Sequence, residues 1–148
     1  MNSKQRIVLG FALLVGLATA APTMAEPPAN RSSLVGTWVN VNPKTGGVVK
    51  VVITNDLFGF RVHTYGACSP TPCDHGAIKA SPFSKTVSST VASGLSAIYN
   101  FGFKTTLVTA KRTAEYDGAS FLELESRNVF AAGDTRFDYM QSELFRKQ

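Results

Sequence analysis

The chain of 148 residues carries a formal net charge of +5, and 44% of its residues are hydrophobic. Its lysines and arginines are scattered among acids without a basic run, which argues against the clustered charge of a nucleic-acid-binding surface. This length is enough for one domain with one hydrophobic core.

The N-terminal segment has the pattern of a cleavable signal peptide. Lys4 and Arg6 precede an apolar run over residues 7–21, which is too short to span a bilayer. Small residues at the −3 and −1 positions predict cleavage after Ala25, with Ala20 as the alternative site. We therefore expect a periplasmic or secreted protein with no membrane span left after cleavage, in which 13 basic residues stand against 10 acidic ones.

The segment that follows predicts a flexible lead and then a meander of three strands. Residues 26–33 are polar and contain prolines, so the folded domain is expected to cover residues 34–148. Alternating apolar and β-branched residues separated by turn clusters predict strands at 34–41, 48–54 and 58–65.

The second half of the domain continues the pattern of short strands and turns. Pro82 is expected to end the fourth strand, and no structure is predicted for residues 86–97, which Ser, Thr and Ala dominate. The further predicted strands cover residues 76–80, about 96–101, 103–111, 121–129 and 135–146.

Seven or eight strands without a convincing amphipathic helix predict an all-β domain. The turns every eight to twelve residues favour a single antiparallel up-and-down barrel, because closure removes exposed strand edges; a β-sandwich is the alternative. Alternation places Phe58, Phe60 and Val62 on one face of their strand, and Phe103, Thr105, Leu107 and Thr109 on one face of theirs. A ligand has no room inside if the interior is filled by the large aromatics, which are Phe58, Phe60, Phe101, Phe103, Phe121 and Phe137.

Gly36 and Trp38 form a Gly-x-Trp on the first predicted strand, and Arg146 lies near the end of the last one. This resembles the calycin pattern of lipocalins and avidins. The resemblance implies that Trp38 packs at the closed end of a barrel and that the Arg146 guanidinium lies over its indole, which is a favourable cation–π arrangement.

Two cysteines five positions apart, Cys68 and Cys73, predict a disulfide if the protein is exported. The surrounding Cys-x-Pro-Thr-x-Cys-Asp-x-Gly, over residues 68–76, resembles a motif of uncharacterised exported bacterial proteins, although His75 stands where that motif has Trp. This resemblance implies no known activity.

The same segment holds the residues with the most chemistry. His63, Tyr65, Asp74 and His75 are the candidate ligand or contact residues. Thiolate, imidazole and carboxylate are also suitable ligands for zinc or copper, so His63 and His75 together with the two cysteines and Asp74 form an alternative metal site; oxidation of the cysteines would remove it.

Few residues support catalysis, and no cofactor is predicted. The sequence contains no Gly-x-Ser-x-Gly, His-Glu-x-x-His or Gly-rich phosphate loop, and Glu123 and Glu125 share one strand face, where a glycosidase needs its carboxylates across the sugar bond. The first hypothesis is therefore a non-enzymatic barrel that binds a small hydrophobic or amphipathic ligand. The alternative is an envelope module that binds a protein partner through loop 68–73, and a hydrolase or isomerase comes third.

Overall fold

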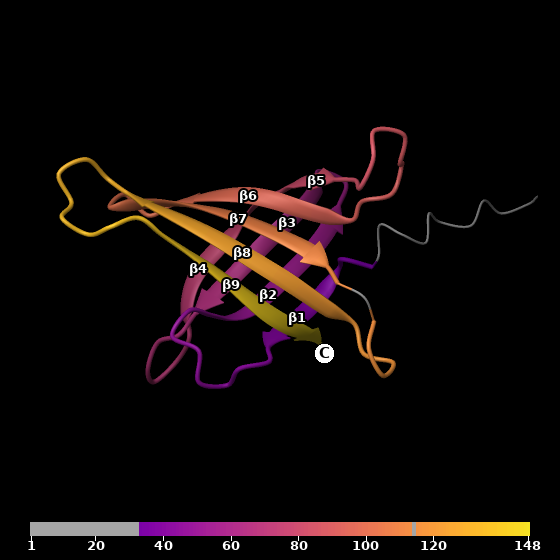
Figure 1. Cartoon of the computed structure of the whole chain (residues 1–148), viewed down its shortest axis with the longest axis horizontal. Coiled ribbons are helices and arrows are strands. Elements are labelled where there is room, and N and C mark those ends of the chain that lie inside the picture. Colours follow the sequence, from indigo (N-terminus) through magenta and orange to yellow (C-terminus); the bar gives the residue numbers. More distant parts are fainter. Residues whose placement is uncertain (1–32, 114) are drawn as a thin grey trace, which may run out of the picture.

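The computed structural model of the protein describes residues 33–113 and 115–148, so the predicted signal peptide and almost all of the lead lie outside the described residues. The described chain forms nine β-strands of one antiparallel sheet (Figure 1). The strands are β1 (Gly36–Asn40), β2 (Val48–Asp56), β3 (Gly59–Gly66), β4 (Cys73–Lys79), β5 (Ser81–Phe83), β6 (Gly94–Asn100), β7 (Lys104–Arg112), β8 (Phe121–Phe130) and β9 (Tyr139–Lys147).

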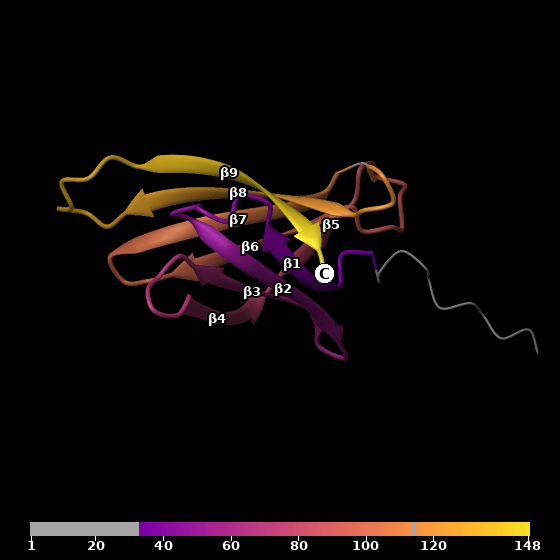
Figure 2. The same cartoon turned by 90° about the horizontal axis from the view of Figure 1, so that it is seen from below.

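The sheet folds over on itself. Its order is β4-β3-β2-β1-β9-β8-β7-β6-β5, so the first and last strands of the chain pair and join two meanders. Figure 2 shows β1–β4 below β6–β9 as two layers with the interior between them. Backbone pairing ends at β4 and β5, and the sheet is not closed into a barrel. The predicted all-β antiparallel architecture is confirmed. The predicted closed barrel is not observed, because no backbone pairing joins the edge strands β4 and β5.

The limits of several strands differ from the prediction. β4 begins at Cys73, and Pro82 belongs to a short strand β5 instead of ending one. A proline is tolerated there because β5 is an edge strand, on which one side needs no backbone donor. β6 begins at Gly94, inside the segment left unassigned, and β9 begins only at Tyr139.

One end of the interior is a continuous apolar core. Its fully buried side chains include Trp38 and Phe145 together with leucine, isoleucine and valine from β2, β3 and β8. Burial of such side chains is the main stabilising contribution of a small domain. The indole Nε1 of Trp38 donates to the carbonyl oxygen of Leu34 at 2.9 Å, so its one polar group is satisfied.

The cation over the Trp38 indole is Lys147, whose Nζ lies 5.3 Å from the ring centroid. Arg146, which the calycin resemblance places there, pairs with Val39 and is exposed. Gly36 makes room for the lysine, because a Cβ at that position would lie 2.7 Å from Lys147 Cε. The arrangement of glycine, indole and C-terminal cation is therefore present one residue later than expected.

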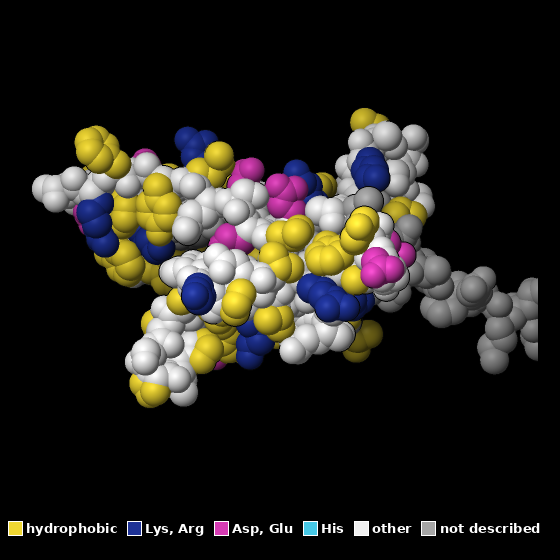
Figure 3. Space-filling model, turned by 60° about the horizontal axis from the view of Figure 1, so that its bottom comes forward, with side chains coloured by type: hydrophobic (Ala, Val, Ile, Leu, Met, Phe, Trp, Pro, Cys, Tyr) yellow, Lys and Arg dark blue, Asp and Glu magenta, His cyan; other side chains and the backbone are white. Residues whose placement is uncertain are grey.

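The large aromatics do not fill the interior. Phe60 is buried and Phe101 is half-buried at the polar end, while Phe58 and Phe137 are 85% and 94% exposed. Leu107 lies on the outer face of β7, and Phe103, just before this strand, is half exposed, whereas Thr106, Val108 and Ala110 face inward. Figure 3 shows hydrophobic side chains beside lysine and arginine at the end of the molecule where the β8–β9 hairpin projects. The alternation predicted for this strand is confirmed, and its inward face is the one that carries polar groups.

Candidate functional site

The second end of the interior is polar. Thr64, Thr106, Ser126 and Asn128 are at most 6% exposed and alternate with outward-facing residues on β3, β7 and β8. The register places Thr106 opposite Asn128 and Val108 opposite Ser126. Buried polar side chains of this kind need hydrogen-bond partners, because leaving a buried polar group unpaired is unfavourable.

A cavity of about 210 Å³ lies within this polar end. Its wall comes from β3, β4 and β6 on one side and from β7, β8 and β9 on the other, with the loops before β2 and β4 at its margin. An engineered cavity of about 150 Å³ is large enough to admit benzene, so this space suits a small molecule. It is smaller than the roughly 300–1,000 Å³ typical of sites for drug-sized ligands.

A lysine, an asparagine and a threonine form a hydrogen-bonded cluster on one wall. Lys104 Nζ donates to Asn128 Oδ1 at 2.9 Å, and the Thr106 hydroxyl donates to the same oxygen at 2.8 Å. The ammonium also lies 3.4 Å from the hydroxyl oxygen of Tyr139 and 5.4 Å from the ring centroid of Phe101. A positive charge is thus held inside the cavity by neutral groups.

Tyr99 connects the two layers on the opposite wall. Two residues of β4 stand opposite Thr64 at a bulge between β3 and β4, where Gly76 has a φ of +82°, a left-handed backbone conformation that favours glycine. The Tyr99 hydroxyl accepts from the Thr64 N–H at 3.1 Å and lies 3.0 Å from the Val62 oxygen and 3.1 Å from the Gly76 oxygen. One side chain of β6 therefore satisfies backbone groups that the bulge removes from the ladder. Burial raises the pKa of the Tyr99 hydroxyl.

His75 lies inside the cavity beside this tyrosine. Its Nδ1 is hydrogen-bonded to the Thr64 hydroxyl at 3.0 Å, and its ring meets Phe101 edge-on with the centroids 5.2 Å apart. Gly66 allows this packing, because a Cβ there would lie 2.8 Å from His75 Nε2. Burial, followed by the charge of Lys104, lowers the pKa of His75. The ring is therefore neutral at neutral pH and adds no charge to the cavity.

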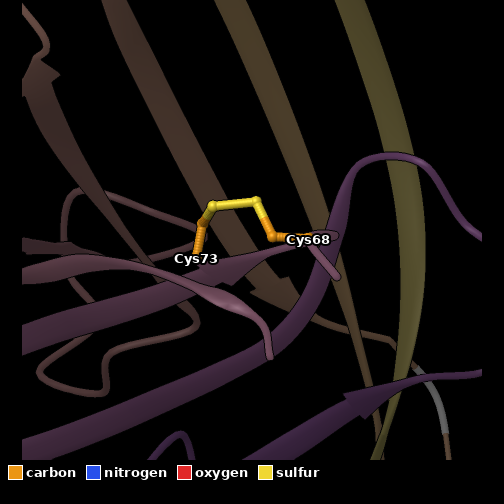
Figure 4. Close-up of a disulfide and its surroundings, with 2 residues drawn as sticks. All are labelled: Cys68 and Cys73. Atoms are coloured by element: carbon orange, nitrogen blue, oxygen red, sulfur yellow. A yellow bond between two sulfur atoms is a disulfide. The ribbon is translucent and has the colours of Figure 1, made fainter. Parts of the chain in front are cut away.

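Two loops form the margin of the cavity. The predicted bond between Cys68 and Cys73 is present, with 5.4 Å between the two Cα atoms, and Figure 4 shows it bridging the base of the β3–β4 loop. On the other side, Glu143 of β9 accepts from Asn40 Nδ2 and from the Val48 N–H, both at 3.0 Å, and from the Thr45 hydroxyl. Both loops are thus anchored to strands, so the margin of the cavity is constrained.

The other predicted site residues lie on the outer face of the sheet. His63 Nε2 contacts a carboxylate oxygen of Asp74, and the hydrogen bond from His63 is the largest cause of the lowered pKa of that carboxyl. Tyr65 stacks on His63 with centroids 4.3 Å apart, and its hydroxyl lies 3.3 Å from His63 Nδ1. The four candidates are therefore split, with His75 inside and the other three outside.

The structure does not assemble the alternative metal site. The two cysteine sulfurs are bonded to each other, and the two histidines lie on opposite faces of the sheet. Within residues 33–113 and 115–148, no group of three or more His, Cys, Asp or Glu side chains is placed to hold a metal ion.

The sequence reasoning missed Tyr99, Lys104, Thr106 and Asn128 as site residues. A signal was available in the alternation itself, since Lys104 and Thr106 share one face of β7 and Ser126 and Asn128 share one face of β8. Alternation alone does not say which of the two faces of a strand is buried. Only the pairing of the strands shows that they meet inside.

Comparison of the chain with models of protein families, with curated proteins and with solved structures finds no match. In the described part of the chain, no helix has the length and apolar character needed to cross a membrane.

Proposed function

We propose that this protein is an exported, non-enzymatic binding protein that holds a small amphipathic ligand in the cavity at the polar end of its sheet. The observation that supports the proposal is the lining of the cavity, which combines aromatic rings with buried polar groups. Concave sites of this composition are the usual form of a small-molecule pocket. Export rests on the signal-peptide pattern of residues 1–25 and on the disulfide.

The ligand-binding body is proposed to be a calycin-like barrel. Three features support it: the layers face each other around one interior, Trp38 sits in the apolar end beneath a C-terminal cation, and the chain passes from β4 to β5 through Ala80 alone. In this proposal the hydroxyl of Tyr99 on β6 links the two ends of the sheet, because it bonds backbone groups of β3 and β4 where the backbone ladder is not closed.

Native mass spectrometry of the protein purified from its own host tests the proposal. We expect a retained small molecule in the natural protein and its loss when Ser126→Leu fills the cavity, because Ser126 lines it and is buried. Glu125→Leu is the matched control, since the neighbouring residue on β8 is exposed. Retention of the same molecule by the folded Ser126→Leu protein would show that the ligand lies elsewhere.

The exposed loop between Cys68 and Cys73 supports a second candidate function, contact with an envelope protein. Residues 69–72 are all exposed, and the disulfide and two prolines limit the entropy that the loop would lose on binding. Crosslinking in the host with a photoreactive residue in place of Thr71 tests this, with Thr54 on β2 as an exposed control position. Capture of the same partner with equal yield from both positions would contradict the proposal that the loop is the contact surface.

The arrangement around His63 gives little support to a hydrolase or isomerase. A general base needs a ring nitrogen that can reach a substrate. Asp74 and the Tyr65 hydroxyl contact the two ring nitrogens of His63.

A further inference from the structure

We infer that the cavity selects a small organic carboxylate, whose anionic group pairs with Lys104 and whose apolar part lies against the aromatic wall. This rests on the proposed ligand-binding function and names the ligand class of the same site.

The lining of the cavity carries one full charge. Lys104 is its ammonium, none of the described lining residues is an aspartate or glutamate, and His75 is the other titratable base. In residues 33–113 and 115–148, no carboxylate lies within ion-pair distance of Lys104 Nζ. A partly buried ammonium without a counter-ion favours an anion strongly, because solvent screens the attraction less than at the surface.

The contacts of Lys104 leave it able to bind a ligand. An ammonium has three N–H donors, and the protein acceptors at Nζ are Asn128 Oδ1 and the Tyr139 hydroxyl. Its aromatic neighbours, Phe101 at 5.4 Å and Tyr139 at 5.7 Å, hold the charge by cation–π contacts without neutralising it. One donor and the whole charge therefore remain for a carboxylate.

Asn128 supplies further donor capacity next to the ammonium. An ammonium only donates, so the atom of Asn128 that faces Lys104 must be its amide oxygen, and the Thr106 hydroxyl donates to the same atom. Both of these hydrogen bonds engage the amide oxygen, so the NH₂ of Asn128 is the donor group that this side chain offers to a ligand in the cavity. The Ser126 hydroxyl lies on the same strand and lines the same cavity.

The facing wall is suited to an apolar group. Tyr99 and Phe101 are stacked with their centroids 5.8 Å apart, and the His75 ring packs edge-on against Phe101. The disulfide continues this wall toward the margin of the cavity, and Val108 adds an apolar side chain from β7. A carboxylate carrying a ring or a short alkyl chain would place each part against matching chemistry, and the volume of about 210 Å³ has room for such a molecule.

The experiment titrates the full-length gene product, purified from its own host, with small carboxylates and their uncharged and cationic counterparts. The probes are benzoate, hexanoate and phenylacetate, each with the corresponding amide and amine, followed by protein-observed NMR and calorimetry. We expect a carboxylate to shift the resonances of the Asn128 side-chain amide and to bind more tightly than its amide or amine. Lys104→Met should weaken carboxylate binding by about tenfold or more, as expected for loss of a hydrogen bond to a charged group.

The control is Lys111→Met. Lys111 lies on the same strand with its side chain on the outer face, 3.2 Å from Glu123, so removing it should leave affinity unchanged. Equal binding of an amide or amine in the cavity would overturn the inference about charge and leave the proposed function standing. If no probe perturbs the cavity resonances at millimolar concentration, both are wrong. Phosphate or chloride competing as well as benzoate would also overturn the inference, because it assigns a role to the aromatic wall.

Discussion

The two ends of the interior are built from the same strands but differ in chemistry. At one end β1, β2, β8 and β9 contribute Trp38, Ile53, Leu124 and Phe145, which are fully buried and apolar. At the other end β7 and β8 contribute Thr106, Ser126 and Asn128 with Lys104 beside them, around a cavity. The apolar end supplies the buried apolar surface that a small domain requires for stability. The polar end buries hydrogen-bonding side chains in its place. A polar, incompletely filled interior is the feature for which stability alone offers no reason.

The largest effect is expected at the apolar end. Trp38→Ala removes a fully buried indole and should lower the free energy of unfolding by about 3–5 kcal/mol. Phe58→Ala is the control, because that ring is 85% exposed and its loss should change stability by less than about 0.5 kcal/mol. Urea denaturation measures both, and similar values for the two variants would contradict the assignment of Trp38 to the core.

The next effect is expected where Tyr99 joins the layers. Tyr99→Phe keeps the ring but leaves the Thr64 N–H without its acceptor, which should reduce the free energy of unfolding by about 1–3 kcal/mol. Faster amide hydrogen exchange at Thr64 should accompany the loss. Tyr116→Phe, at a 79% exposed position, should have no such effect. An unchanged Thr64 amide in Tyr99→Phe would mean that the hydroxyl does not close the bulge.

The hydrogen-bonded cluster of Lys104, Thr106 and Asn128 tests whether the polar end contributes to stability as the apolar end does. Asn128→Leu alone should destabilise by about 1–3 kcal/mol, because it removes the amide oxygen to which both Lys104 and Thr106 donate. The triple change Lys104→Met, Thr106→Val and Asn128→Leu removes all partners together, so its stability should lie within about 1 kcal/mol of the natural protein or above it. Thermal and urea unfolding measure the free energy of unfolding of both variants and of the natural protein. A triple variant less stable than the single one would make the cluster structural rather than functional.

The smallest effect is a pH dependence from His75. Its pKa in the folded protein lies below the unfolded value near 6.5, chiefly through burial and then through Lys104, while Asp74 opposes the shift and His63 adds to it. Protonation therefore favours the unfolded chain, and stability should fall as the pH drops below about 6.5, levelling off once the folded form is also protonated. His75→Gln should show a shallower fall over that range. An identical pH profile of unfolding for the variant would contradict this assignment.

The region around β3 and β4 shows how far sequence reasoning reached in the site. The disulfide between Cys68 and Cys73 followed from spacing and compartment, and the alternation of β3 correctly separated His63 from Phe60 and Val62. The separation of His75 from Asp74 was not anticipated, because the predicted strand began at residue 76, whereas β4 begins at Cys73 and alternation places these two neighbours on opposite faces.

By itself the sequence determined that the chain makes many short antiparallel strands, because β-branched residues, period-two alternation and turn residues act over a few positions. It also determined that Trp38 packs in the core and that the two cysteines close a loop. Only the tertiary structure decided which face of β7 points inward, and that Lys104, Asn128, Tyr99 and His75 from four strands surround one cavity. The physical reason is that a strand has two faces, and which one is buried depends on the strands opposite it, since a polar face can be buried wherever its neighbours supply hydrogen bonds.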